Sequence, residues 1–122
     1  MPDLSGILRG KRIGRDGVAK LYDEGVRVPS SMYLLDTTGE GCDTLPYGNE
    51  DGDPDSACFG AAGTMSRIPW AEMPLAQVMA TMAEDDGTLW YADPRHLTAK
   101  AAQPLRDMDL TPVTAVELEF YL

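Results

Sequence analysis

The chain has 122 residues, 43% of them hydrophobic, with 20 acidic against 10 basic side chains and a formal net charge of −10. This length fits one domain, or one domain and part of a second, and the apolar share excludes wholesale disorder. So negative a surface repels nucleic acid and anionic membrane, so neither is expected as a partner, whereas a cation is a more natural ligand.

Cysteine, histidine and long apolar runs are scarce. Cys42 and Cys58 are the only cysteines and form no C-x-x-C pair, and His96 is the only histidine, so a disulfide framework and a zinc site both lack their residues. We interpret the two thiols as buried or as having no functional role. There is no run of about 18 apolar residues to span a membrane and no visible signal peptide, so the cytoplasm is the expected location.

The first 25 residues predict short extended pieces and one helix. The segment DLSGILRGKRIG, residues 3–14, has spaced apolar residues and glycines that permit turns. Asp16 is a candidate N-cap of a helix of about two turns, which Gly25 would end. Three basic side chains precede this helix and are interpreted as solvated surface: Arg9, Lys11 and Arg12.

The middle of the chain alternates between strand and loop signals. The apolar run MYLLD within residues 26–36 predicts a strand that feeds the loop TTGEG. Residues 39–63 are dense in Gly, Asp and Pro, which predicts a loop with one short strand around 57–59. The stretch NEDGDPD lacks the spacing and the distal glutamate of an EF-hand, so we expect a solvated loop there and no calcium site.

Residues 76–91 predict a hairpin, in which AQVMATM and TLWY flank the turn DDG at 85–87. Asp93 and Pro94 then begin a helix, as an N-cap and a first-turn proline. Pro104 should kink or interrupt that helix because it removes one backbone hydrogen bond. Four apolar residues share one helical face: Leu97, Ala101, Leu105 and Met108.

The chain closes on an expected strand over residues 113–122 that would carry two acids on one face. Glu117 and Glu119 would share this face, because side chains two apart on a strand point the same way, about 6.5–7 Å apart. Two carboxylates this close repel each other unless a cation lies beside them, and Mg²⁺ or Mn²⁺ prefers such oxygens. From the spacing alone, a strand whose acids simply face water is the simpler interpretation.

These elements together predict an α+β protein with a small mixed sheet. Several short strands and one short helix fill residues 1–92, and a longer helix and the terminal strand follow.

Several segments of the sequence resemble a known family. VTAVELEFYL resembles the E-x-E-F strand of the glutamine synthetase family, and DLSGILRGKRI resembles the family's opening D-L-x-G-x-x-R-G-K-R-I segment. GDPDSAC and MATMAEDDGTLWYADPR follow the family's order, and RGKRI and AVELEFYL are most similar to its γ-glutamylpolyamine synthetase branch.

The resemblance implies a β-grasp domain over residues 1–92 and the truncated beginning of a catalytic domain over 93–122. The full-length enzyme would be an ATP-dependent ligase that phosphorylates the γ-carboxylate of glutamate and then joins it to ammonia or an amine such as a polyamine. It would be a homo-oligomer with sites shared between subunits. The present chain alone would be inactive.

The resemblance also implies roles for three acidic residues. Glu117 and Glu119 would bind Mg²⁺ or Mn²⁺, with ATP as co-substrate. Asp36 aligns with the aspartate of the D-G-S-S segment that helps to bind ammonium, but LLDTTGE lacks the G-S-S, which is compatible with a larger amine. The alternative is a free-standing, non-enzymatic β-grasp module that serves as a binding or interaction domain.

Overall fold

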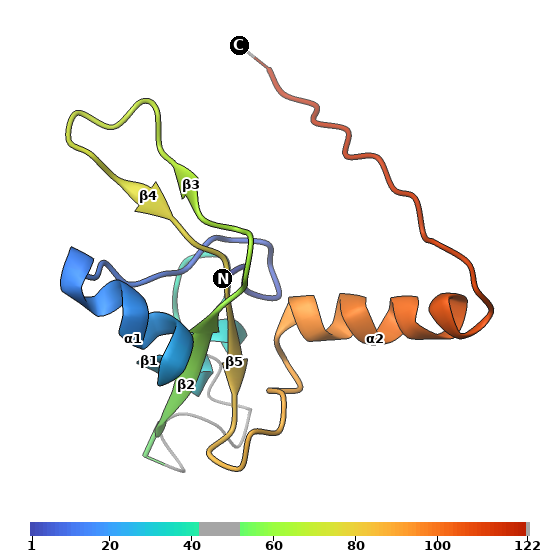
Figure 1. The fold of residues 1–122 in the computed structure, drawn as a ribbon, viewed down its shortest axis with the longest axis horizontal. Coiled ribbons are helices and arrows are strands. Elements are labelled where there is room, and N and C mark those ends of the chain that lie inside the picture. Colours follow the sequence, from blue (N-terminus) through green and yellow to red (C-terminus); the bar gives the residue numbers. More distant parts are fainter. Residues whose placement is uncertain (42–51, 122) are drawn as a thin grey trace.

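The structure is a computed structural model that describes residues 1–41 and 52–121. It is an α+β fold, as expected, built around a small antiparallel sheet with helices beside it (Figure 1). In chain order the elements are the 3-10 helix η1 (Arg15–Gly17), α1 (Val18–Asp23), β1 (Val26–Pro29), the 3-10 helix η2 (Ser30–Leu34), β2 (Asp55–Gly60), β3 (Ser66–Arg67), β4 (Ala76–Gln77), β5 (Ala80–Ala83) and α2 (Pro94–Asp107).

The main sheet has the strand order β1-β2-β5, and both pairings are antiparallel. Cys58 of β2 lies opposite Val26 of β1 and Met82 of β5. The strand expected near 57–59 is therefore confirmed as the central strand, and it extends over residues 55–60. Because it is flanked on both edges, its apolar middle is buried. A second, two-stranded sheet pairs β3 with β4.

Helix α1 packs against β2 through a close backbone approach. Gly25 ends the helical segment at φ 75°, and a Cβ atom placed there would meet the Cys58 carbonyl oxygen at 3.1 Å. The stop signal is thus confirmed. The expected cap is wrong: Asp16 lies inside η1, and the N-cap of α1 is Gly17, without a side-chain hydrogen bond. The extra 3-10 turn moves the start of the α-helix to Val18, one residue past the first helical position that Asp16 would cap.

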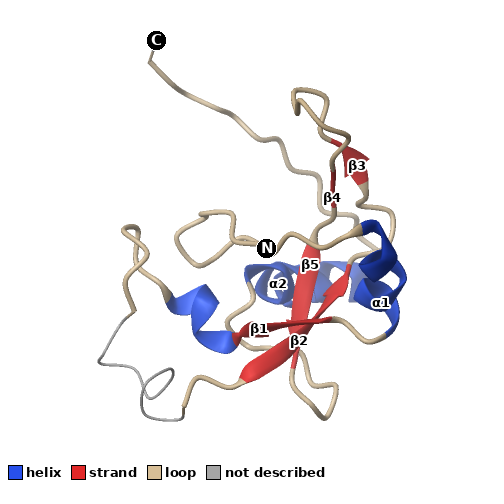
Figure 2. Ribbon diagram, turned by 90° about the vertical axis from the view of Figure 1, so that its left-hand side faces the viewer, coloured by secondary structure: helices blue, strands red, loops and turns tan. Residues whose placement is uncertain are grey.

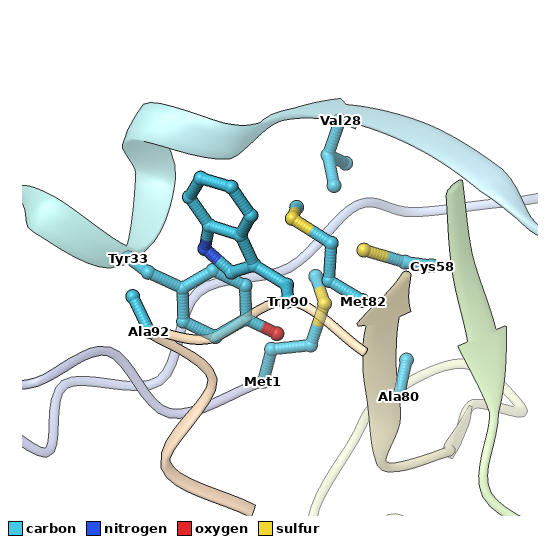
Figure 3. Packing of buried hydrophobic residues seen from close by; sticks show 8 residues of the cluster. All are labelled: Met1, Val28, Tyr33, Cys58, Ala80, Met82, Trp90 and Ala92. Carbon is cyan, nitrogen blue, oxygen red and sulfur yellow. The ribbon is translucent and has the colours of Figure 1, made fainter. Parts of the chain in front are cut away.

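The hydrophobic core lies on one face of the main sheet, and Figure 3 shows the aromatic rings of Tyr33 and Trp90 beside the side chains of Met1 and Met82. Burial of this apolar surface is the main source of the fold's stability. The core residues come from the N-terminus, the three strands of the main sheet, η2 and the segment before α2: Met1, Val28, Tyr33, Cys58, Ala80, Met82, Trp90 and Ala92.

Two expected strands take other forms. The opening segment forms a tight loop that closes through a single bridge between Pro2 and Leu8. The run MYL, residues 32–34, lies in η2, because the preceding strand β1 already ends at Pro29, which has no amide hydrogen to extend a ladder. The 3-10 turn buries Tyr33, whose side chain is 1% exposed.

The expected hairpin is confirmed in its turn and in the part of its outgoing strand that forms β5, whereas residues 76–77 form β4 and pair with β3 instead. The amide of Gly87 bonds the Glu84 carbonyl oxygen at 2.9 Å, and the return segment meets β5 through a bridge between Ala83 and Leu89. The following helix α2 begins at Pro94 behind the Asp93 cap, as expected. It continues through Pro104 to Asp107, so the proline does not interrupt it.

Helix α2 extends away from the sheet (Figures 1 and 2). None of its residues is buried: Leu97 of α2 is 47% exposed, and Met108, its C-cap residue, is 61% exposed. Within residues 1–41 and 52–121, no helix is long and apolar enough to cross a membrane.

Candidate functional site

The two glutamates singled out by the sequence lie on an extended, solvent-exposed segment after α2. Residues 110–121 carry no helix or strand, and every one of them is exposed. Figure 1 shows this segment running away from the end of α2. The expected strand is therefore absent in the described part of the chain, because a strand needs a neighbour for its backbone hydrogen bonds and no described segment pairs with it.

The apolar side of the same segment has no cover. Val116, Leu118 and Phe120 are 85%, 81% and 74% exposed. Isolated exposed apolar residues are common, but a contiguous row of this kind marks an interaction surface. Glu117 and Glu119 thus lie on a segment whose sequence favours a strand, but no described residues form a neighbouring strand with which it could pair.

The donor chemistry of this segment suits a hard divalent cation, but only in part. Carboxylate oxygens are the ligands that Mg²⁺ and Mn²⁺ prefer. Across the described residues, no group of three or more His, Cys, Asp or Glu side chains is placed to hold a metal ion. Glu117 and Glu119 therefore offer two ligands without a third, and a cage would need donors from elsewhere.

Asp36 lies at a separate place, in the loop after η2, where it organises a tight turn. Its Oδ1 accepts hydrogen bonds from the Thr38 amide (2.8 Å), the Thr38 hydroxyl (2.7 Å) and the Glu40 amide (3.0 Å). The Thr38 hydroxyl bond and then the Glu40 amide lower the pKa of Asp36 below its ordinary value. The carboxylate therefore stays ionised and exposed, as a group that binds an ammonium ion must be.

A buried ion pair supports the Asp36 loop from the N-terminus. The Arg9 Nε donates to Asp3 Oδ2 at 2.9 Å, and its Nη2 donates to the Asp36 carbonyl oxygen at 3.3 Å. Burial raises the pKa of Asp3, but hydrogen bonds from the Ile7 amide, Arg9 and the Ser5 amide outweigh it and lower the pKa overall. The expectation that Arg9 is solvated surface is thus wrong, because this side chain is only 22% exposed.

A second polar cluster, centred on Asp93, was foreseen only as a helix cap. Its Oδ1 accepts from the Arg95 amide at 2.9 Å, which confirms the cap. Its Oδ2 also accepts from the Tyr33 hydroxyl (3.0 Å), the Thr81 hydroxyl (2.8 Å) and the Met82 amide (3.0 Å). No local sequence signal predicts these bonds, since their partners come from η2 and β5. The cluster fixes the start of α2 on the core.

His96 joins this cluster through one ring nitrogen. Its Nε2 lies 2.8 Å from the Thr81 hydroxyl and 3.0 Å from the Met82 carbonyl oxygen. The only histidine of the chain is therefore held at the junction of α2 and β5. Neither Glu117 nor Glu119 is among the partners of this cluster, so it is separate from the candidate metal ligands.

Two further expectations concern the cysteines and the acidic loop. Cys58 is buried and free, as expected, and Cys42 lies outside the described residues. The stretch NEDGDPD, residues 49–55, lies partly outside them as well. Its Asp53 accepts hydrogen bonds from the amide and hydroxyl of Ser31 in η2, at 3.3 and 2.9 Å.

No family model matches the chain. Its homologues are nonetheless members of the glutamine synthetase family, which confirms the resemblance drawn from the sequence. One of them is the γ-glutamylputrescine synthetase of Escherichia coli, which is 37% identical over 124 residues that cover 100% of this chain and 26% of that protein.

Two further comparisons agree. The γ-glutamylethanolamide synthetase of Streptomyces coelicolor is 28% identical over 98% of this chain and 26% of its own length. A crystal structure described as a novel glutamine synthase homolog matches with a TM-score of 0.75 at 22% identity, over 88% of this chain and 25% of its own. This likeness confirms the α+β fold. The chain spans about a quarter of the length of the relatives it matches.

Proposed function

We propose that this chain is part of an ATP-dependent ligase that joins the γ-carboxyl group of glutamate to ammonia or an amine. The observation that carries the proposal is the 37% identity to a γ-glutamylputrescine synthetase along the entire chain. A second relative is named for another γ-glutamyl amide, γ-glutamylethanolamide. An amine larger than ammonia is therefore the favoured second substrate.

The chain's own contribution to this chemistry would be the pair Glu117 and Glu119. In the complete enzyme this segment would become a strand, its apolar side would be covered, and both carboxylates would point into the reaction site. Bound Mg²⁺ or Mn²⁺ would offset the negative charge of the phosphoryl group that passes from ATP to glutamate. The chain alone offers two ligands, so we expect it to bind these cations weakly and to be inactive.

Asp36 would serve the amine substrate. Its hydrogen bonds use Oδ1, its pKa is lowered, and the side chain is exposed, so an anionic oxygen remains available to a protonated amine. The turn that positions it is braced by Arg9 and through it by buried Asp3. Because Asp36 and the two glutamates lie on different elements, subunits of a homo-oligomer could each supply one part of a shared site.

We place the proposed domain boundary between the part of the chain that carries Asp36 and the part that carries Glu117 and Glu119. Residues 1–92 would form the β-grasp domain, and residues 93–122 would begin the catalytic domain, in the cytoplasm. Leu97 of α2 and its C-cap residue Met108 support this division, because these exposed apolar side chains offer a packing face that the preceding domain would leave uncovered.

A chimera tests the proposal. The present chain replaces the matching segment of the Escherichia coli γ-glutamylputrescine synthetase, and putrescine-dependent ATP hydrolysis is measured. We expect an active chimera that loses activity by about a hundredfold or more with Glu117→Ala or Glu119→Ala, since each would remove a metal ligand. Glu72→Ala, which removes an exposed acid from the β3–β4 connection, is the matched control and should retain activity.

The alternative, a free-standing binding module, gives the opposite result. A chimera that folds and assembles but hydrolyses no ATP, or one whose activity survives loss of both carboxylates, contradicts the metal role. Correct folding is checked by the circular dichroism spectrum and by gel filtration against the parent enzyme.

A further inference from the structure

The guanidinium group of Arg9 bonds two groups that are far apart in the sequence. Its Nε donates to Asp3 Oδ2 at 2.9 Å, and its Nη2 donates to the main-chain carbonyl oxygen of Asp36 at 3.3 Å. The Asp3 side chain is 0% exposed, whereas the bond to Asp36 lies at the surface. Arg9 therefore connects a buried point of the domain with an exposed loop.

The buried end of this connection is firmly held. Besides the bond from Arg9, the Asp3 carboxylate accepts hydrogen bonds at Oδ1 from the Ser5 amide (3.0 Å) and the Ile7 amide (2.8 Å). A buried polar group whose hydrogen bonds are satisfied is rigid. Because the guanidinium is planar, the bond at Nε also sets the direction in which Nη2 points.

The exposed end is the turn of residues 36–40, which is closed by bonds of its own. The Asp36 amide donates to the Glu40 carbonyl oxygen at 2.9 Å, and the Gly39 amide donates to the Asp36 carbonyl oxygen at 3.1 Å. A Cβ atom placed on Gly39 would lie 3.6 Å from Arg9 Nη1, so the guanidinium also lies beside this part of the turn. Within residues 1–41 and 52–121, Arg9 is the only residue outside the turn that forms a hydrogen bond with it.

The closed turn in its own right orients the Asp36 carboxylate. All three hydrogen bonds to this carboxylate, from the Thr38 amide, the Thr38 hydroxyl and the Glu40 amide, end on Oδ1. Within the described chain, Oδ2 is left for a ligand. If the turn opened, these donors would move away, and the carboxylate would have to be ordered again at the moment of binding, which weakens binding.

We propose that Arg9 is a positioning residue for the amine substrate: anchored by Asp3, it holds the turn of residues 36–40 closed, so that Asp36 Oδ2 faces the protonated amine. This inference rests on the amine-binding role proposed above for Asp36. The effect should be specific to the amine, because Arg9 contacts the Asp36 turn and neither Glu117 nor Glu119.

The substitution Arg9→Lys in the chimera separates positioning from stability. Lysine keeps a positive charge beside Asp3, but its single nitrogen cannot also reach the Asp36 carbonyl oxygen. We expect the KM for putrescine to rise about tenfold, the size expected for one hydrogen bond from a charged donor, while kcat and the KM for ATP stay unchanged. Arg15→Lys makes the same change at an exposed position of η1 and is the matched control, which should leave all three constants unchanged.

Asp3→Asn tests the anchor in the same chimera. It keeps an oxygen that can accept from the Ser5 and Ile7 amides but removes the negative charge that holds Arg9. The KM for putrescine should rise as it does in Arg9→Lys. Circular dichroism spectra that match the parent confirm that both variants fold, and a putrescine KM unchanged in both overturns the proposal.

Carboxyl-carbon NMR of the 122-residue chain supplies a measurement that needs no activity. The Thr38 hydroxyl and then the Glu40 amide hold the pKa of Asp36 below its ordinary value. In Arg9→Lys this pKa should rise toward the ordinary value because the turn opens more often, whereas Arg15→Lys should leave it low. An Asp36 pKa that does not change in Arg9→Lys overturns the proposal.

Asp36→Asn in the chimera distinguishes the two ways in which the proposal could fail. If this substitution leaves the KM for putrescine unchanged, the amine role of Asp36 is wrong, and the positioning role of Arg9 falls with it. If Asp36→Asn raises the KM and Arg9→Lys changes neither the KM nor the Asp36 pKa, the amine site stands and only the role of Arg9 is wrong.

Discussion

The buried carboxylate of Asp93 accepts a hydrogen bond of 3.0 Å from the hydroxyl group of Tyr33, 60 positions earlier in the chain. The Asp93 side chain caps α2, while Tyr33, a residue of η2, lies in the hydrophobic core. One contact thus joins the start of α2, the helix that precedes Glu117 and Glu119, to η2, the 3-10 helix that precedes Asp36. Burial raises the pKa of Tyr33, and the negative charge of Asp93 raises it further, so the phenol keeps its proton at neutral pH and donates this hydrogen bond to Asp93.

Loss of the Asp93 carboxylate should be among the most damaging substitutions. Asp93→Ala leaves three buried donors, on Tyr33, Thr81 and Met82, without their acceptor, and unfolding should become easier by about 3 kcal/mol or more. Tyr33→Phe removes one bond and should cost about 1 kcal/mol. Urea titrations followed by circular dichroism measure both. Asp16→Ala, at an exposed position, is the control, and an Asp93→Ala chain as stable as that control contradicts the structure.

The ion pair of Asp3 and Arg9 predicts a defined dependence of stability on pH. The pKa of Asp3 is lowered in the folded protein, so its contribution is fully present above the unfolded-state pKa of about 4 and is lost as the pH falls through the lower folded value. We expect the difference in unfolding free energy between the parent and Asp3→Asn to be constant from neutral pH down to about pH 5 and to shrink below pH 4. A difference that grows on acidification contradicts the assignment.

Cys58 should be inert in the folded state. Burial, with a smaller contribution from the charge of Asp93, raises the pKa of its thiol to about 12, so almost no thiolate exists at neutral pH. In a Cys42→Ser background, the reaction with Ellman's reagent should proceed only as fast as the chain unfolds, and urea should accelerate it. A fast reaction in buffer alone would show that Cys58 is accessible.

Local signals in the sequence were sufficient for the elements that are stabilised locally. Asp93 followed by Pro94 marks the start of α2, Gly25 marks the end of α1, and the turn at 85–87 closes the hairpin, because each of these depends on residues within a few positions. The central strand β2 was found for a similar reason, as an apolar run between turn residues.

The remaining features depend on distant residues, which is why the sequence did not reveal them. Tyr33 is drawn into a 3-10 turn by burial in the core and by its bond to Asp93, although its neighbours favour a strand. Arg9 is held by Asp3 and the Asp36 carbonyl oxygen, although basic clusters are usually solvated. The segment of Glu117 and Glu119 has the sequence of a strand, but a strand also requires a partner. The family resemblance, and not periodicity, identified this segment.

The close approach of α1 to β2 makes Gly25 intolerant of a side chain. Its φ of 75° is costly for any residue with a Cβ atom, and that atom would meet the Cys58 carbonyl oxygen at 3.1 Å. Gly25→Ala should therefore lower the unfolding free energy by about 1–2 kcal/mol. Gly14→Ala is the matched control, because Gly14 has φ −73° and open space around it, so alanine there should be neutral or slightly stabilising. Equal effects of the two substitutions in thermal unfolding would contradict the packing described.

Deletion of residues 111–122 should leave the stability of the folded domain unchanged in dilute solution. Residues 111–121 are exposed throughout and make no backbone hydrogen bond to the rest of the described chain, so their removal takes away no burial and no partner. The midpoint and slope of a urea titration at low micromolar concentration should match those of the parent, because the slope reports the surface exposed on unfolding. A truncated chain that is less stable even when dilute would show that the segment packs on its own domain.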